Sequence, residues 1–457
     1  MIRAMILAAG QGTRMKSQHP KVMHQICGET LLGWVDRAAK AAGAEETIVI
    51  VGHGKEEICQ AYENSDWRFA EQPMGEGFPY GTGYAVMQGM DTIKDEDQVL
   101  VLTGDTPLIE GEDLMALVDK HQACKAAATV LSAHVDNPTG YGRILRDDQG
   151  VVGIVEEKDA SDAERMIQEI NSGIFCFQGA ALKRALERLT TDNAQGEYYL
   201  TDALAILRGL GEVVESHCLT EPDHIRGINS RVQLAEATRI RQAKINESWM
   251  QAGVTLIDPS STYIDVDVVI GQDTVLEPNV QLKGKTKVGS HVEIGSMSKI
   301  IDSEIGDGVT IDSSKIIESQ VGNKTTVGPF AYLRPKSRIG QGCRIGDFVE
   351  VKNAVIGNGS KASHLSYVGD AIVGERVNIG CGVVFVNYDG KKKSQTIVED
   401  DAFIGSNANL VAPVHVKKKG FVAAGSTITR DVEEGDLSIA RAKQVNKAGW
   451  AERFFNK

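Results

Sequence analysis

The first residues that could do chemistry form a glycine loop close to the N-terminus. Within residues 7–16, Gly10 and Gly12 have no side chains, so backbone N–H groups there could approach a phosphate. Arg14 adds a forked cation that can pair with phosphate oxygens. A Gly-x-Gly after a strand is weak evidence alone, and no third glycine follows at the spacing of a dinucleotide fingerprint. A plain strand-to-helix turn therefore stays open as the alternative.

A second candidate is Asp105, which closely follows the apolar run at residues 98–102. Ligands of open α/β sheets bind beyond the carboxyl ends of the strands. Mg²⁺ prefers carboxylate and phosphate oxygens and keeps some of its waters. The position of Asp105 therefore predicts a magnesium ligand, with a helix-capping role as the alternative.

Polar residues that would contribute nothing to a stacked core occur in the C-terminal half. Arg334, Lys352 and Lys393 could form a cationic pocket for a sugar phosphate. His364 is a candidate general base, because a neutral imidazole can accept an amine proton near pH 7. A single histidine is more often structural than catalytic, so His364 needs support from its surroundings.

The elements that must position these residues differ between the two halves. Residues 1–228 alternate short apolar runs (4–8, 46–51 and 98–102) with helical spacing such as that of residues 31–42. This alternation predicts a Rossmann-like α/β domain with a mostly parallel sheet. We expect residues 229–252 to form a linker helix and residues 253–457 to form a second domain.

The sequence of the second domain repeats every six residues. An aliphatic residue followed by glycine recurs through this half, which is typical of a parallel β-helix. We expect the aliphatic residue to point inward and the glycine to take a corner conformation that a Cβ would oppose. A string of glycine-rich turns in an antiparallel protein is the alternative. The repeats begin at Ile270, Val288, Ile305, Ile339, Ile345, Ile356, Val373 and Ile379.

Composition limits the class of partner. The formal net charge of −13 disfavours nucleic acid or an anionic membrane as the main partner. Seven cysteines without metal-like spacing indicate reduced thiols in the cytoplasm. The first residues are expected to form a buried strand and not a secretory signal, and no run is long enough to span a bilayer.

Taken together, these motifs resemble a known family. Residues 7–16 with Pro20 and Lys21 resemble the sugar-phosphate nucleotidyltransferases. The whole set of motifs is similar to that of the bacterial bifunctional N-acetylglucosamine-1-phosphate uridyltransferase/glucosamine-1-phosphate acetyltransferases. The further motifs that carry this resemblance are residues 140–143, 154–158, 169–173, 193–202 and 227–231, and, in the repeat half, residues 360–370 and 386–393. This likeness covers essentially the whole chain and implies a left-handed β-helix that assembles as a homotrimer.

The resemblance assigns roles in the N-terminal half. It implies that Arg14 and Lys21 contact the triphosphate, and that Asp105 and Asn229 hold Mg²⁺. N-acetylglucosamine 1-phosphate would attack the α-phosphorus of UTP and release pyrophosphate. The implied nucleotide and sugar contacts are Leu7, Ala8, Ala9, Gly10, Gly12, Thr13, Gln72, Gly81, Thr82, Gly142, Glu156, Asn171 and Asn229.

The resemblance also assigns an acetyltransferase to the repeats, with His364 as its base and acetyl-CoA as donor. Its product would be the substrate of the N-terminal half. Ser363 and Cys381 stand where the family commonly has Gly and Ala, and we expect both small residues to be tolerated. The implied substrate contacts are Arg334, Lys352, Tyr367, Asn378, Asn387, Tyr388 and Lys393, and the implied coenzyme A contacts are Ser406, Ala424 and Arg441.

One segment departs from the family pattern. The family usually has a compact Gln-x-x-Gln-Leu-Gly-Thr-Gly-His segment that contacts uracil. Here residues 71–84 contain a few extra residues, from Met74 to Phe78, and no second glutamine. Gln72, Gly81 and Thr82 still match, so UTP is the expected nucleotide ahead of dTTP or ATP.

Three alternatives share parts of this architecture. The first is another sugar-1-phosphate nucleotidyltransferase with a regulatory β-helix, against which His364 and the pair Asn387 and Tyr388 argue. The second is a non-catalytic exchange-factor subunit, which would need neither Lys21 nor Asp105. The third is a β-helix acetyltransferase for other sugars, which the intact N-terminal motifs disfavour. We therefore expect a cytoplasmic enzyme that acts on small molecules.

Overall fold

The first strand, β1 (Ile2–Ala8), lies in the middle of the N-terminal sheet, as expected for a buried strand. It pairs in parallel with β4 on one side and β6 on the other. The order of the sheet is β11-β7-β10-β6-β1-β4-β5, and only β10 on this path is antiparallel to its neighbours. The bounds are β4 (Glu46–Val51), β5 (Arg68–Glu71), β6 (Gln98–Thr103), β7 (Ala128–His134), β10 (Glu169–Gln178) and β11 (Val214–Leu219), and the hairpin β8 (Arg143–Asp147) and β9 (Gly150–Val155) is joined to β10.

Both faces of this sheet are buried. Ala4 and Ile6 of β1 belong to one hydrophobic cluster, while Met5 belongs to another. A strand covered on both faces needs apolar residues throughout, which explains why these strands are unbroken apolar runs. The helices are α1 (Leu31–Ala41), α2 (Lys55–Ala61), α3 (Thr82–Gln88), α4 (Gly111–Ala123), α5 (Asp162–Arg165), α6 (Gly179–Leu186) and α7 (Asp202–Gly209).

The structure is a computed model that describes residues 1–455 and divides into two compact units, Met1–Arg241 and Gln242–Lys457. Helix α8 (Arg231–Gln251) contributes residues to both units. In the first unit, Arg241 donates to Glu110 at 2.6 Å. In the second, Gln242 donates to the Thr262 carbonyl at 2.8 Å. The domain limits proposed at residues 228 and 253 remain a prediction.

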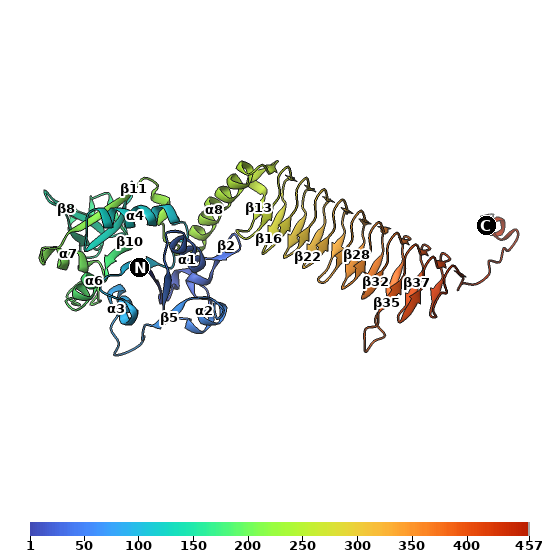
Figure 1. Cartoon of the computed structure of the whole chain (residues 1–457), viewed down its shortest axis with the longest axis horizontal. Coiled ribbons are helices and arrows are strands. Elements are labelled where there is room, and N and C mark those ends of the chain that lie inside the picture. The colour runs from blue at the N-terminus through green and yellow to red at the C-terminus, as the bar shows by residue number, and fades with distance from the viewer. Residues whose placement is uncertain (456–457) are drawn as a thin grey trace. The chain divides into compact units, whose positions relative to one another are not determined.

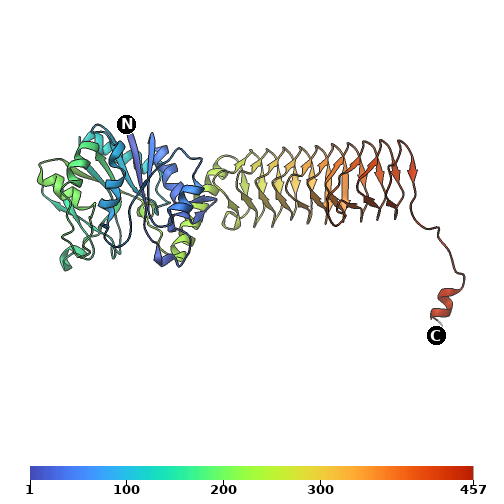
Figure 2. The ribbon, with the colours of Figure 1, turned by 90° about the horizontal axis from the view of Figure 1, so that it is seen from below.

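The second unit is a parallel β-helix, visible as a regular stack of coils in Figures 1 and 2. Each coil gives one short strand to each of three sheets, and all pairings within the sheets are parallel. This architecture is that of a left-handed β-helix of hexapeptide repeats. The first sheet runs from β12 (Thr255–Leu256) to β41 (Leu437–Ser438), the second from β13 (Tyr263–Ile264) to β40 (Thr427–Ile428), and the third from β14 (Val269–Ile270) to β38 (Val414–Val416).

The aliphatic residues of the repeats form the core, as predicted. Ile305, Val321, Ile339 and Ile356 are buried in four consecutive coils of the third sheet. Each fully buried side chain of this size contributes about 1.5–3 kcal/mol relative to exposure. Because every coil repeats the arrangement, the stack buries one continuous core.

The predicted reason for the repeat glycines was wrong. Gly357, directly after Ile356, has no left-handed φ; instead, a Cβ there would meet the carbonyl group of Gly374 in the next coil at 2.5 Å. The left-handed corner lies two residues later, at Gly359 (φ +67°), and in other coils at Asp273 or His291. The glycine after the aliphatic residue is therefore required by close packing of coils, whereas the corner tolerates several residue types.

The last helix is α9 (Trp450–Phe455), which follows the stack after an irregular segment. Among residues 1–455, no helix combines the length and the apolar character needed to cross a membrane.

Candidate active sites

A cavity of about 280 Å³ opens beyond the carboxyl end of β1. We call it the nucleotide cavity. Its wall includes many of the residues predicted to bind the nucleotide, whereas Gly12, Thr13 and Arg14 do not line it. Thr13 and Arg14 are exposed on a 3-10 turn, Thr13–Met15. The predicted residues in the wall are Leu7, Ala8, Ala9, Gly10, Lys21, Gln72, Gly81, Thr82 and Asp105, and the others are Val22, Met74, Tyr80, Ala85, Thr103 and Glu197.

Lys21 lies between the two predicted metal ligands. Its Nζ donates to Asp105 and, at 3.1 Å, to Oδ1 of Asn229. The backbone holds Asn229 there, because the N–H of Ile228 donates to the carbonyl of Asp105 at 2.8 Å. Gly12 fits against Lys21, since a Cβ on Gly12 would meet Cβ of Lys21 at 2.6 Å. Oxygens of Asp105 and Asn229, which lie far apart in the sequence, thus both contact the Lys21 ammonium group.

The three predicted amino-sugar residues also meet. The N–H of Asn171 donates to the carbonyl of Gly142 at 2.9 Å, at an irregularity in the pairing of β10. A Cβ on Gly142 would lie 3.4 Å from Oε2 of Glu156, which follows β9. Burial raises the pKa of the Glu156 carboxyl, and the charges of Asp202 and Asp159 add to this, although a hydrogen bond from Thr201 opposes it.

The segment that departs from the family pattern joins β5 to α3 and contributes directly to the nucleotide cavity. Met74, Tyr80 and Gln72 all line the wall, and Gln72 is only 5% exposed. The end of the segment is fixed to the chain around Tyr198: the Tyr198 N–H donates to the Tyr80 carbonyl, and the Gly83 N–H donates to the Tyr198 carbonyl, both at 2.8 Å. Of the extra residues, Met74 therefore forms part of the cavity wall.

In the β-helix, His364 lies at the end of β30 (Lys361–His364), beside Asp347 at the end of β27 (Arg344–Asp347). Nδ1 of His364 is 2.7 Å from Oδ1 of Asp347. The hydrogen bond from His364 lowers the pKa of Asp347, so this carboxylate stays ionised and can only accept. The neutral imidazole then holds its proton on Nδ1, and Nε2 is left as a base. The His364 side chain is 56% exposed, so substrate can reach it.

The predicted sugar-phosphate residues surround a buried carboxylate, Asp370. It accepts hydrogen bonds from Lys352 at 3.2 Å, from Asn353 at 2.6 Å and from Asn387. Burial raises the pKa of Asp370, but these three donors outweigh it and hold the pKa below its usual value. Asn387 also donates to the Tyr367 hydroxyl at 3.4 Å. Asp370 thus organises four groups of the site.

Lys393 adds a second cation beside this cluster. It lies in an excursion of the chain between β34 (Val384–Val386) and β35 (Thr396–Val398), seen near the label β35 in Figure 1. Tyr388 forms an isolated bridge with Lys393, which fixes the excursion. The ammonium group of Lys352 lowers the pKa of Lys393, as expected when two cations lie together. Such a pair favours binding of an anion.

Arg334 is tied to a neighbouring coil. Its Nη1 donates to Oε1 of Glu350 at 2.8 Å. Glu350 pairs in register with Tyr367 of the next coil, so Arg334 lies on the same face as the Asp370 cluster.

The predicted coenzyme A residues continue one corner of the coil stack. Asn378 belongs to β33 (Asn378–Ile379). A Cβ on Gly380, after β33, would lie 2.6 Å from N of Ser406, and one on Gly405 would lie 2.5 Å from N of Ala424. Arg441 follows in the next coil, its Cδ 3.8 Å from a Cβ placed on Gly425. By the strand register, Ser406 and Ala424 occupy the corner position that His364 occupies in an earlier coil.

Several residues of these sites were not predicted, among them three carboxylates. Asp347 lies 17 residues before His364, which is one coil of the repeat, so the repeat length could have found it. Asp370 lies within residues 360–370, a segment already singled out, but its burial was not apparent from the motif. Glu197 lines the nucleotide cavity from residues 193–202 and had no assigned role.

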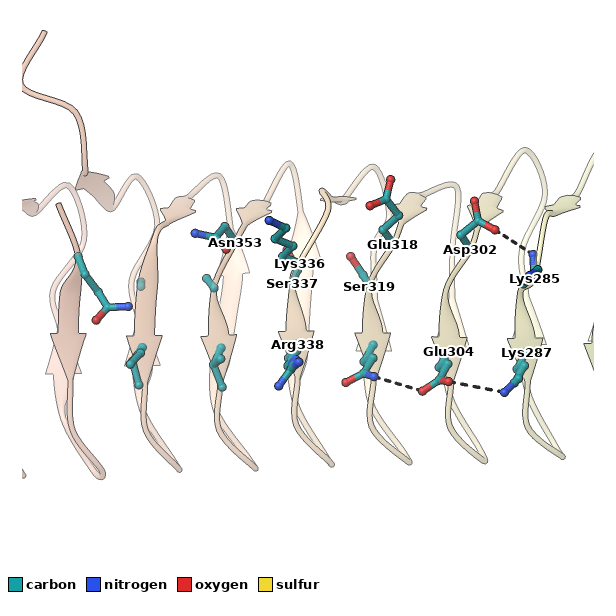
Figure 3. A pocket seen from close by; sticks show the side chains of 16 residues that line it. Lys285, Lys287, Asp302, Glu304, Glu318, Ser319, Lys336, Ser337, Arg338 and Asn353 are labelled. Carbon is teal, nitrogen blue, oxygen red and sulfur yellow. Dashed lines mark hydrogen bonds and ion pairs between the residues drawn. The ribbon is translucent and has the colours of Figure 1, made fainter. Parts of the chain in front are cut away.

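A further groove lies in the β-helix. About 840 Å³ in volume, it follows one face of the β-helix and is lined by none of the predicted site residues. Figure 3 shows its charges balanced from coil to coil, with Lys287 lying 3.8 Å from Glu304. Opposite charges cancel along the groove, so it offers no concentration of one sign to a charged substrate.

Comparison with known proteins is consistent with this geometry. A family model described as a MobA-like NTP transferase domain matches residues 4–198, and one described as a GMPPB C-terminal domain matches residues 318–436. The bifunctional protein GlmU of Clostridioides difficile (strain 630) is 54% identical over 454 residues, 99% of this chain and 97% of that protein. Proteins of the same name from Alkaliphilus metalliredigens and Caldanaerobacter subterraneus subsp. tengcongensis are each 50% identical, over 99% of this chain and 98% of theirs.

A solved structure of a putative glucose-1-phosphate thymidylyltransferase from Bacillus anthracis, 17% identical, superposes with a TM-score of 0.42 over 52% of this chain and 95% of that chain. A likeness at this score carries no argument about function.

Proposed function

The chain belongs to the family of the bifunctional protein GlmU, and on this premise we propose which of its residues support the two activities. It is a bifunctional enzyme: it acetylates glucosamine 1-phosphate with acetyl-CoA, then transfers UMP from UTP to N-acetylglucosamine 1-phosphate and releases pyrophosphate. The product, UDP-N-acetylglucosamine, is a precursor of cell-wall polymers. The single observation that supports this function best is the pair of prepared sites, one around Lys21 and one around His364.

The pair Asp105 and Asn229 suits Mg²⁺. Both present oxygens to one point, and the Lys21 ammonium already stands there as a cation. No group of three acidic, histidine or cysteine side chains that could hold a metal occurs in residues 1–455, so phosphate oxygens and water would complete the coordination. When bound, the ion neutralises charge on the triphosphate.

Uridylyl transfer then needs mainly positioning and charge neutralisation. Lys21 and Arg14 contact the phosphates, and the loop of residues 7–13 lets backbone N–H groups approach them. Gly142, Glu156 and Asn171 hold the amino sugar, with the Glu156 carboxylate accepting from its hydroxyl groups. The phosphate oxygen of the sugar attacks the α-phosphorus in line, and pyrophosphate departs.

Acetyl transfer uses His364 as a general base. Its Nε2 takes a proton from the amine of glucosamine 1-phosphate while Asp347 holds Nδ1–H, and the amine attacks the thioester carbonyl. The coenzyme A thiolate leaves as the amide forms. Lys352, Lys393 and Arg334 bind the sugar phosphate, while Tyr367, Asn378, Asn387 and Tyr388 contact the substrates. Ser406, Ala424 and Arg441 line the path of coenzyme A.

The assembly we propose is a cytoplasmic homotrimer formed through the β-helix. The observation that supports it is a run of exposed apolar side chains at one corner of three consecutive coils: Phe330, Phe348 and Leu365. The rings of Phe330 and Phe348 stack with centroids 5.5 Å apart. Contiguous exposed apolar surface marks an interface, and Leu365 directly follows His364. Light scattering should give three times the 49.3 kDa of one chain.

The central experiment supplies the intact protein with glucosamine 1-phosphate, acetyl-CoA, UTP and Mg²⁺. We expect UDP-N-acetylglucosamine, detected by mass spectrometry, together with free coenzyme A and pyrophosphate. Omitting acetyl-CoA should stop the sequence unless N-acetylglucosamine 1-phosphate is added. Absence of the nucleotide sugar under all these conditions would refute the proposal.

A further inference from the structure

The nucleotide cavity has a wall that the family pattern does not provide. Residues 72–81 are longer than the compact family segment, and they bring Met74 and Tyr80 into the wall. Tyr80 is 40% exposed although its ring lines a cavity. Among residues 1–455, no hydrogen bond forms to the Tyr80 hydroxyl. An aromatic ring left open in a cavity is available to a planar ligand.

The Tyr80 backbone is held in place by the surrounding chain. The Tyr80 carbonyl accepts from the Tyr198 N–H at 2.8 Å, and the Leu200 N–H donates to the Thr82 hydroxyl at 3.1 Å. Gly81, at φ +118°, lets the chain press against Tyr198, because a Cβ there would collide with the Tyr198 backbone. The Tyr80 backbone is therefore fixed before any ligand arrives, and little backbone conformational entropy is lost on binding.

Gln72 supplies a second, independent observation. Its residue is 5% exposed and lines the same cavity, yet its side-chain amide makes no hydrogen bond within the described part of the chain. An amide in the cavity wall that has no protein partner can hydrogen-bond to a ligand held there. A nucleobase suits both residues. Its π-face can stack on the Tyr80 ring, and the donors and acceptors on its edge can hydrogen-bond to the Gln72 amide.

We propose that Tyr80 is a further base-binding residue, which stacks on the base of the nucleoside triphosphate, while Gln72, already expected to contact the base, hydrogen-bonds to its edge. The proposal rests on the assignment of this cavity to UTP and goes beyond it. Because stacking acts on the bound nucleotide before and during reaction alike, Tyr80 affects KM for UTP and leaves kcat nearly unchanged.

The test compares Tyr80→Ala, Tyr80→Phe and Phe78→Ala in uridylyl transfer by the full chain. Phe78 is the matched control: it is an aromatic residue of the same segment, 51% exposed, that does not line the cavity. We expect Tyr80→Ala to raise KM for UTP on the order of tenfold, since removing one base-stacking ring typically costs this much affinity. Tyr80→Phe and Phe78→Ala should stay within about twofold of the original KM.

A baseless probe separates stacking from damage to the whole site. Inorganic tripolyphosphate occupies the phosphate end, so its inhibition constant should be equal in Tyr80→Ala and in the original protein. The proposal is overturned if Tyr80→Ala leaves KM for UTP unchanged, if Phe78→Ala raises it equally, or if tripolyphosphate weakens in parallel. If the original protein forms no nucleotide sugar from UTP, the assigned function fails instead.

Discussion

Nδ1 of His364 lies 2.7 Å from Oδ1 of Asp347, in the coil directly before it. The pairing is possible because equivalent residues of successive coils lie next to each other in a parallel β-helix. Asp347 is ionised and can only accept, so it selects the imidazole tautomer with a free Nε2. The repeat thus supplies the residue that orients the proposed base.

Replacing Asp347 distinguishes orientation from simple loss of charge. Asparagine can donate to Nδ1 and would favour the tautomer with the proton on Nε2, so Asp347→Asn should lower kcat of acetyl transfer more than Asp347→Ala does. We expect at least about a tenfold loss for asparagine, because the wrong tautomer disables a histidine base. Steady-state kinetics of both variants provide the measurement. Equal losses would contradict the tautomer argument.

The two activities should separate by mutation. His364→Ala should abolish acetyl transfer and leave uridylyl transfer nearly unchanged, and Asp105→Ala should do the reverse, since the two residues belong to different compact units. Each half-reaction can be assayed alone by supplying its own substrates. Loss of both activities in a variant with a normal circular dichroism spectrum would disprove the model of two independent sites.

Lys21 should matter mainly for the rate of uridylyl transfer. Lys21→Met removes the cation that lies between Asp105 and Asn229. We expect kcat to fall on the order of 10²–10³, which is typical of losing one prepared charged donor. Lys16→Met is the control, because Lys16 is an exposed lysine just after the same loop. A similar loss in both variants would indicate a general charge effect.

Uridylyl transfer should weaken in mild acid through Glu156. Burial raises the pKa of this carboxyl above its ordinary value of 4.5, so it takes up a proton at a higher pH than an exposed glutamate does. A protonated Glu156 accepts fewer hydrogen bonds, so KM for N-acetylglucosamine 1-phosphate should rise as pH falls. Glu156→Gln should have a higher KM that depends less on pH. Titration of the sugar phosphate affects the original protein and Glu156→Gln equally. A difference between them in how steeply KM changes with pH is therefore assigned to Glu156.

The glycines of the repeat should differ in their importance to stability. In Gly357→Ala the new Cβ meets the next coil at 2.5 Å, and we expect a cost of about 1–3 kcal/mol or more in the free energy of unfolding. Gly342 has φ +65° and nothing within 4 Å, so Gly342→Ala should cost only about 1 kcal/mol of backbone strain. Urea unfolding followed by circular dichroism gives both values. A larger loss of unfolding free energy in Gly342→Ala than in Gly357→Ala would show that a left-handed φ, and not close packing of coils, is the main reason for these glycines.

Much of the architecture could be predicted from local pattern. Strands buried on both faces must be apolar throughout, which located β1, β4 and β6. The six-residue repeat predicted the β-helix, because each short side of a coil needs one inward aliphatic residue. Asp105 could be proposed as a ligand from its place after a strand, whereas Asn229 was paired with it only through family resemblance.

The amino-acid sequence by itself determined the two kinds of fold and the residue types available for chemistry, because hydrophobic periodicity and glycine spacing act over a few residues. Only the tertiary structure decided which of those residues meet. Ile228 must bond to Asp105 for Asn229 to reach Lys21, and the coil register must place Asn387 beside Asp370. Likewise, the glycine after each aliphatic residue is needed because of a neighbouring coil, and that constraint exists only once the chain has folded.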